Sequence, residues 1–274
     1  MIILVEILPT LKFITEHYLL KKFYKTTTHK NQNSVYNMAT QYAFGKIITD
    51  GLVLCLDAAD RNSYVSGSTT WNSMVGSTTG SLVNGPTFNS TNGGSIVFDG
   101  TNDYVSVPNC IRTGVGFSGT VEIITNCTGS LLFNERTDNF GGDGYFLVTS
   151  GSTLSIGVNS LNALPYTYFL TSSIAGNLNQ INHYIASYTI PTTTGTMSGI
   201  LGINGQFETL SSSISVGGTM SNFTTVDIGR QKNYVYGTTY SSSGRVYIVR
   251  IYNRRLSQSE MLQNFNAQKS RFGL

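Results

Sequence analysis

GLVLCLDAADRNSY, at residues 51–64, and GGSIVFDGTNDYVSVP, at residues 93–108, bracket the part of the sequence that decides the fold. Short strand-forming runs at 52–56, 96–98 and 104–107 are each bounded by Asp, Gly or Asn. Such runs between turn-forming residues are typical of antiparallel strands. We therefore predict that this region forms the first strands of an antiparallel β-sandwich.

The same strand and turn pattern continues to residue 252. Further strand-forming runs occur at 119–124, 131–134, 145–149, 154–158, 166–171, 183–189, 199–207, 225–229 and 245–252. Asn204-Gly205 lies between apolar flanks and is a strong hairpin signal. The absence of helical segments between the runs argues against a parallel α/β sheet. Segments rich in Ser, Thr, Gly and Asn are predicted to be long loops at the rim of the sandwich: 171–182, 190–198 and 231–244.

A helix is predicted near the C-terminal end, and its start has a specific signature. Ser257 and Glu260 have the spacing of a capping box, in which each side chain bonds the backbone N–H of the other residue. Leu256 and Met261 have the spacing of a hydrophobic staple. The side chains that we expect to pack against a sheet edge are Met261, Leu262 and Phe265.

Several motifs follow one another in a fixed order along the chain. They are the opening stretch at 51–64, Trp71, NGPTF at 84–88, FDGTNDY at 98–104 and IYNRRLSQSEMLQNFNAQKSRFGL at 251–274. In this order they resemble the concanavalin A-like, laminin-G-like jelly-roll domains of phage and large-virus structural proteins. The resemblance covers residues 45–274, more loosely in the middle third. It implies an all-β, two-sheet antiparallel jelly-roll sandwich with a short C-terminal helix and a core or near-core position for Trp71.

The resemblance also implies a function. We expect a virion structural protein, such as a capsid- or tail-attached decoration, fibre or adhesin subunit. It would be made in the host cytoplasm and lie on the particle surface, as a homo-oligomer in contact with other virion proteins. Its mechanism would be non-covalent recognition of a protein or a glycan by loops on a rigid scaffold. A carbohydrate-binding receptor lectin is the alternative, and a glycoside hydrolase is a third hypothesis.

Residues 1–37 differ in composition from the rest of the chain. The segment at 1–25 is apolar but interrupted by charged residues and Pro9, so it lacks the run of about 20 apolar residues that a membrane-spanning helix needs. It also lacks the features of a secretory signal. Two interpretations stay open: an amphipathic arm that docks on a partner or a membrane surface, or a translated leader upstream of a natural start at Met38. The predicted domains are thus an N-terminal extension at 1–37 and a laminin-G-like sandwich at 38–274.

The net charge of +3 comes from this extension. Residues 1–37 contain five Lys and two acidic residues, whereas the rest of the chain has twelve basic and twelve acidic residues. The predicted sandwich has no Lys and Arg cluster interleaved with aromatic residues, which argues against nucleic acid as a partner. Charged residues make up 11% of the chain, against about 25% in an average soluble protein. This low charge suits a surface that packs against neighbouring subunits.

The acidic residues argue against catalysis. Glucan-cleaving enzymes of this fold resemble one another in a strand with alternating carboxylates, which places an acid and a nucleophile on one face. Here Glu122 stands alone in TVEIIT at 120–125. His183 is accompanied by no nucleophile-elbow motif. We therefore predict no catalytic residue and no enzymatic activity.

Calcium is the metal that the resemblance allows, because related lectin domains hold it at the rim, and no cofactor is required for the expected function. The best cluster of oxygen ligands is Asp99, Asn102 and Asp103. The same residues are typical of a turn in which Asp99 and Asn102 bond their own backbone and Gly100 has a positive φ. We favour the turn and keep calcium as the alternative. A weaker calcium candidate combines Asp138, Asn139 and Asp143.

The three cysteines predict no disulfide framework. Their number is odd, and no secretory signal precedes them. Cys55 lies in an apolar strand run and is predicted to be a core residue. Cys110 and Cys127 could pair, and their spacing does not decide the question.

Carbohydrate recognition is the remaining hypothesis for a site. Sugars have apolar ring faces and many hydroxyls, so their sites combine exposed aromatic rings with polar groups. The candidate residues lie in or directly before the rim loop predicted at 231–244: Arg230, Asn233, Tyr234, Tyr236 and Tyr240. Tyr166 and Tyr168 form a second set. Tyrosine is also enriched at subunit interfaces, so both uses of these side chains stay open.

Overall fold

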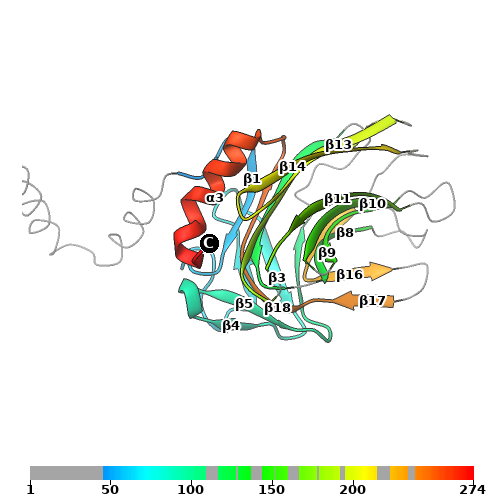
Figure 1. Ribbon diagram of the computed structural model, residues 1–274. Helices are drawn as coiled ribbons and strands as arrows, with labels where there is room; N and C mark the ends of the chain where they lie inside the picture. The colour runs from blue at the N-terminus through cyan, green and yellow to red at the C-terminus, as the bar shows by residue number, and fades with distance from the viewer. Residues whose placement is uncertain are drawn as a thin grey trace, which may run out of the picture. The chain divides into compact units, whose positions relative to one another are not determined.

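Two antiparallel sheets face each other, as the strand pattern predicts (Figure 1). The computed structural model describes residues 46–108, 117–127, 129–136, 144–150, 152–159, 167–177, 179–191, 195–214, 223–233 and 238–274. Residues Ile47–Leu274 form one compact unit. The predicted extension at 1–37 lies outside the described residues. Within the described part of the chain, no helix combines the length and the apolar character needed to span a membrane.

Within the described ranges, sheet A has eight strands arranged around β18. In spatial order they are β14 (Gln206–Ile214), β13 (Gly195–Ile203), β12 (Asn182–Thr189), β7 (Ser118–Thr125), β18 (Ser243–Tyr252), β5 (Ser95–Asp99) and β4 (Thr87–Asn89), with β1 (Leu52–Asp57) also paired to β18. β18 pairs with β7 along one edge and with β5 and then β1 along the other. The last long strand of the chain is therefore central to a sheet that the first strand helps to build.

Sheet B also has eight strands. In order they are β11 (Thr167–Ala175), β10 (Thr153–Asn159), β9 (Gly144–Ser150), β8 (Gly129–Arg136), β15 (Phe223–Ile228), β6 (Tyr104–Pro108), β3 (Thr79–Val83) and β2 (Thr70–Asn72). A short 3₁₀ helix, η1 (Thr91–Gly93), precedes β5. The predicted hairpin at Asn204-Gly205 joins β13 to β14, with φ of 50° and 79° at the two turn residues. These positive φ values belong to the turn that matches strand twist.

The predicted rim loops are shorter than the sequence indicates. β16 (Arg230–Asn233) pairs with β17 (Thr238–Ser241), so the loop predicted at 231–244 contains two strands. β11 extends to Ala175 and β13 begins at Gly195, which corrects the loops predicted at 171–182 and 190–198. Thr and Tyr favour extended backbone even where the local composition is polar. Polar composition alone therefore does not distinguish loops from strands in these segments.

The main hydrophobic core lies between the two sheets. Leu54 of β1, Trp71 of β2, Phe98 of β5 and Ile123 of β7 are all buried in it. Trp71 has the core position that the resemblance implies. Cys55 and Cys127 are buried free thiols, and Cys110 lies outside the described residues.

Helix α3 (Gln258–Phe272) begins as predicted. Ser257 Oγ accepts a hydrogen bond from the Glu260 backbone N–H, and the Glu260 carboxylate accepts one from the Ser257 backbone N–H at 2.8 Å. Leu256 and Met261 are buried in the same cluster, as a hydrophobic staple requires. The helix ends at Gly273, whose φ of 70° is left-handed.

α3 covers the outer face of sheet A rather than a sheet edge (Figure 1). Its Asn264 contacts Glu122 of β7, and the ring of Phe265 lies 5.5 Å from that of His183 on β12. Leu262 does not face the sheet, because it is 40% exposed. Met261 and Phe265 are four residues apart and share the inward stripe, whereas Leu262 is rotated by about 100° from Met261. The central strands β7 and β18 are thus covered on both faces.

Candidate functional site

The predicted carbohydrate residues lie on the two-stranded β16–β17 ribbon. Arg230 pairs with Ser241, and Tyr240 pairs with Gln231 on the next rung. Because side chains alternate along a strand, Arg230 and Tyr240 belong to opposite faces of the ribbon. Tyr240 is 55% exposed. The structure therefore does not gather these two side chains into one binding surface.

The other predicted carbohydrate residues lie outside the described residues or are described only by their strand. Asn233 ends β16, and the structure places its backbone only. Tyr234, Tyr236 and Tyr166 lie outside the described residues. Tyr168 belongs to β11, at the far end of sheet B in strand order.

Arg230 has a structural role at the start of β16. Its Nε donates to Asp227 Oδ2 at 3.0 Å, and its Nη2 donates to the same oxygen. The guanidinium also lies over the ring of Tyr104, 3.6 Å from the centroid. Asp227 is fully buried, and a buried carboxylate needs such a partner. Arg230 is therefore held by the fold.

The calcium candidates form the turn that the sequence favours. Asp99 Oδ1 accepts from the backbone N–H of Thr101 at 2.7 Å, and Asp103 Oδ2 accepts from the N–H of Asp99 at 3.1 Å. Gly100 has a φ of 81°. The bond from Thr101 lowers the pKa of Asp99, whereas burial raises the pKa of Asp103. In the described ranges, no three His, Cys, Asp or Glu side chains group as metal ligands, and the weaker cluster at 138–143 lies outside them.

Glu122 faces α3 and is shut off from solvent. Its Oε1 contacts Arg250 Nη1 at 2.7 Å and His183 Nε2 at 2.9 Å, and its Oε2 accepts from Asn264 at 2.8 Å. Burial alone raises the pKa of a carboxyl group, but the Arg250 charge and the bonds from His183 and Asn264 outweigh it and lower the pKa of Glu122 to about 2. A buried, fully engaged carboxylate cannot reach a substrate.

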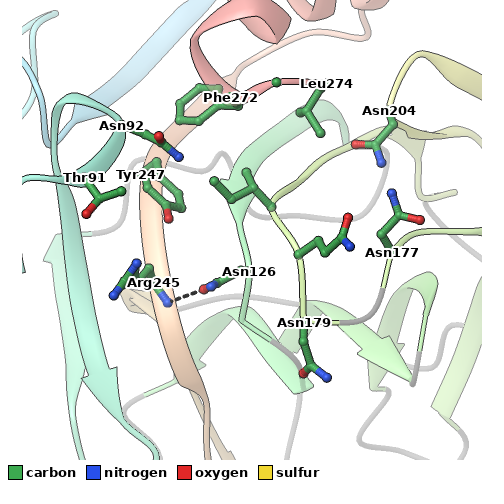
Figure 2. Close-up of a pocket in the computed structure, with 13 residues that line it drawn as sticks. Thr91, Asn92, Asn126, Asn177, Asn179, Asn204, Arg245, Tyr247, Phe272 and Leu274 are labelled. Atoms are coloured by element: carbon green, nitrogen blue, oxygen red, sulfur yellow. Dashed lines mark hydrogen bonds between the residues drawn. The ribbon is translucent and has the colours of Figure 1, made fainter.

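A polar cavity of about 510 Å³ opens on the outer face of sheet A, beside the end of α3 (Figure 2). We call it the amide trough. Five Asn and one Gln are among its thirteen lining residues, which are Thr91, Asn92, Asn126, Asn177, Asn179, Gln180, Ile181, Asn204, Arg245, Tyr247, Phe272, Gly273 and Leu274. Figure 2 shows Thr91 and Asn92 on one side and Asn177, Asn179 and Asn204 on the other.

Apolar packing forms the floor of the amide trough. The rings of Tyr247 and Phe272 meet edge to face with centroids 5.3 Å apart, and both side chains are buried. Ile181 and Leu274 pack against the same cluster. The floor joins β18 to the end of α3, so the docked helix contributes part of the trough's lining.

A buried asparagine holds one wall of the amide trough in place. Asn182 Nδ2 donates to the carbonyls of Asn177 and Gln180 at 2.8 and 3.0 Å. Its Oδ1 accepts from the Asn177 N–H at 2.9 Å and from Asn204 Nδ2 at 2.8 Å. Asn204 also accepts from the backbone of His183. With these bonds Asn182 fastens the β11–β12 connection to the β13–β14 turn.

The second wall depends on Asn126, which follows β7. Its Oδ1 accepts from the Arg245 N–H at 2.7 Å, and its own N–H donates to the Arg245 carbonyl at 3.1 Å. Arg245 is the one charged residue among the thirteen that line the trough. The lining thus combines many amides with a single cation.

Sequence reasoning missed the amide trough. The one sequence feature that points to the trough is the amide-rich segment NLNQ at 177–180. Its composition predicts a rim loop but not a binding site. The remaining lining residues come from separate parts of the chain, and nothing in their local sequence indicates that they meet.

Known structures share the fold. The receptor-binding domain of botulinum neurotoxin type G superposes with a TM-score of 0.54 at 13% identity, over 80% of this chain and 52% of that chain. The serotype D ligand-binding domain in complex with N-acetylneuraminic acid gives a TM-score of 0.57 at 13% identity, over 81% and 52%. The chain thus spans about half the length of these proteins. At this identity the likeness shows a β-sandwich of the same kind.

Sequence comparison adds nothing further. No protein-family model and no curated protein matches the chain. The jelly-roll character of the predicted family agrees with these neighbours, and its phage or viral character is not addressed by them.

Proposed function

We propose that this domain binds a glycan and that the amide trough receives it. The observation that carries the proposal is the lining of the cavity, in which amides surround a space of about 510 Å³. Sugar hydroxyls both donate and accept hydrogen bonds, and each Asn or Gln side chain offers two donors and an acceptor. The volume also lies within the range of about 300–1,000 Å³ that is usual for small-ligand sites.

The structural neighbours support the same function class. They are receptor-binding and ligand-binding domains of toxins, and one of them is in complex with N-acetylneuraminic acid. About half of that neighbour lies outside the match, so the position of its sugar is not carried over. The neighbours therefore support glycan recognition by a β-sandwich. The amide trough as its location rests on the residues of this chain alone.

The virion role is the second candidate function, and the resemblance of the motifs at both ends of the domain favours it. The toxin domains lend nothing to it. The sequence resemblance alone supports four further proposals. They are a location on the particle surface, a homo-oligomeric state, other virion proteins as partners and the lack of enzymatic activity. A virion adhesin that binds a glycan would satisfy both lines of argument.

A glycan array probed with the full chain, with and without calcium, tests the proposal. Asn177 and Gln180 have exposed side chains, so the double variant Asn177→Ala and Gln180→Ala should fold and lose binding. Tyr240→Ala is the matched control on the β16–β17 ribbon and should bind normally. The reverse result would place the site at the ribbon. Failure of the folded chain to bind any glycan would contradict the proposal, and stoichiometric incorporation into purified particles would then favour the virion scaffold.

A further inference from the structure

We infer that the amide trough selects sugars that carry a carboxylate and that Arg245 is the residue that recognises this group. The inference rests on the proposed glycan binding and names the class of sugar. It starts from the side chains of the described lining, among which the Arg245 guanidinium is the one that carries a charge. A cationic side chain among uncharged side chains favours a negatively charged group on the ligand.

The backbone of Arg245 is held in place before any ligand arrives. Asn126 bonds both its N–H, at 2.7 Å, and its carbonyl, at 3.1 Å. Thr125 Oγ1 donates to the same carbonyl at 2.7 Å. A side chain whose root is fixed loses less conformational freedom on binding than one on a mobile loop. Arg245 is therefore placed as a recognition residue.

The guanidinium of Arg245 differs from those of four other arginines in its ion pairing. Arg230, Arg250, Arg254 and Arg271 each form an ion pair with a carboxylate. Arg245 forms no such pair with any carboxylate in the described residues, and its side chain is partly exposed. A planar guanidinium matches a carboxylate with two parallel hydrogen bonds. The trough thus offers the acid of a sugar its complementary group.

The remaining lining suits the rest of such a sugar. Asn177 and Gln180 also line the trough and are exposed, so their amides can donate to and accept from ring hydroxyls. Phosphate would also pair with a guanidinium, but it carries nearly two charges at neutral pH, and the described residues of the lining include no second cationic side chain to meet them. A uronic or sialic acid therefore fits better than a sugar phosphate.

A matched pair of ligands tests the inference. Methyl glucuronide and methyl glucoside differ only in the carboxylate, and their binding to the full chain can be measured by NMR titration, with glucose 6-phosphate as a third probe. We expect the glucuronide to bind about tenfold or more tightly than the glucoside, the usual size of a hydrogen-bonded charge contact. Sialyllactose and lactose form a second such pair, in case the trough needs a longer ligand.

Variants assign the preference to one residue. Arg245→Gln should abolish the preference for the acid while neutral-sugar binding stays, and Arg245→Lys should keep part of it. Arg255→Gln, at the other end of α3, is the control and should change nothing. If Arg245→Gln does not fold, the salt dependence of binding to the native chain tests the role of charge. Sodium chloride should weaken binding of the glucuronide and leave binding of the glucoside unchanged.

Each outcome has a distinct meaning. Equal affinity for both members of each pair, or an acid preference that survives in folded Arg245→Gln, would overturn the inference and leave glycan binding intact. Tighter binding of glucose 6-phosphate would overturn the choice of carboxylate. Binding of no sugar at all would overturn the proposed function together with the inference.

Discussion

The carboxylate of Glu122 accepts a hydrogen bond of 2.8 Å from the side chain of Asn264, although the two residues are 142 positions apart. Arg250 and His183 meet the other oxygen of the same carboxylate. Asn264 also donates to the hydroxyl of Tyr252 at 2.9 Å. This buried polar layer fastens α3 to the outer face of sheet A, and the amide trough lies at the end of that helix.

Glu122→Gln should strongly destabilise the fold. The substitution keeps the shape of the side chain but leaves Arg250 as a buried charge without a counter-charge, a change that costs about 3–5 kcal/mol. Urea unfolding followed through the fluorescence of the single, buried Trp71 gives the free energy. Asp50→Asn is the control, because Asp50 pairs with Arg254 on the surface and is 85% exposed. A similarly small loss of unfolding free energy in both variants would show that the buried Glu122–Arg250 pair contributes little to stability.

Stability should fall as the pH is lowered from 5 to 2. Burial raises the pKa of Glu122, but Arg250, His183 and Asn264 together lower it from 4.5 to about 2. Between these values the unfolded chain binds the proton and the folded chain does not, so stability is present above 4.5 and is lost toward 2. The contribution is about 3 kcal/mol, at 1.36 kcal/mol for each pH unit.

The urea midpoint measured at intervals across this pH range tests the expectation. The pKa of Glu260 is also lowered to about 2, first by its hydrogen bond to Arg254, but that pair is partly exposed and contributes less. Glu122→Gln should therefore flatten the pH dependence without abolishing it. An unchanged slope in this variant would contradict the assignment to Glu122.

Gly205→Ala should be more harmful than Gly67→Ala. Both glycines have positive φ, 79° and 86°, which costs an alanine about 1–2 kcal/mol. At Gly205 a Cβ would also lie 2.6 Å from the ring of Phe265, whereas at Gly67 nothing lies within 4 Å. The difference in the two free energies of unfolding isolates the clash between the β13–β14 turn and α3. Equal losses would mean that the ring moves aside freely.

Calcium should not stabilise the turn at Asp99. The carboxylates of Asp99 and Asp103 already accept backbone hydrogen bonds, which fix their orientation within the turn. We expect the same midpoint of thermal unfolding in millimolar calcium and in a chelator, since only a ligand of the folded state raises it. A rise that Asp99→Asn removes would establish the calcium site. A rise that persists in Asp99→Asn would point to the second cluster, Asp138, Asn139 and Asp143.

Much of the fold could be predicted because it is written in short-range patterns. Apolar runs between turn residues placed most strands, Asn204-Gly205 marked a hairpin, and the spacing of Ser257 and Glu260 located the start of α3. The errors fell where polar composition was equated with loops, as at 231–244, where β16 and β17 pair. Extended backbone depends on local preference and pairing as well as on hydrophobicity.

The sequence by itself determined the two-sheet class and the capped helix, because periodicity, turn chemistry and capping act over a few neighbouring residues. Only the tertiary structure decided what the polar residues do. Glu122, which stands alone in the sequence, lies at the centre of a buried polar network. Asn126, Asn177 and Arg245, which are far apart in the sequence, line one cavity. Such groupings arise where strands distant in sequence pair and a helix packs over them, and contacts of that range leave no periodic signal along the chain.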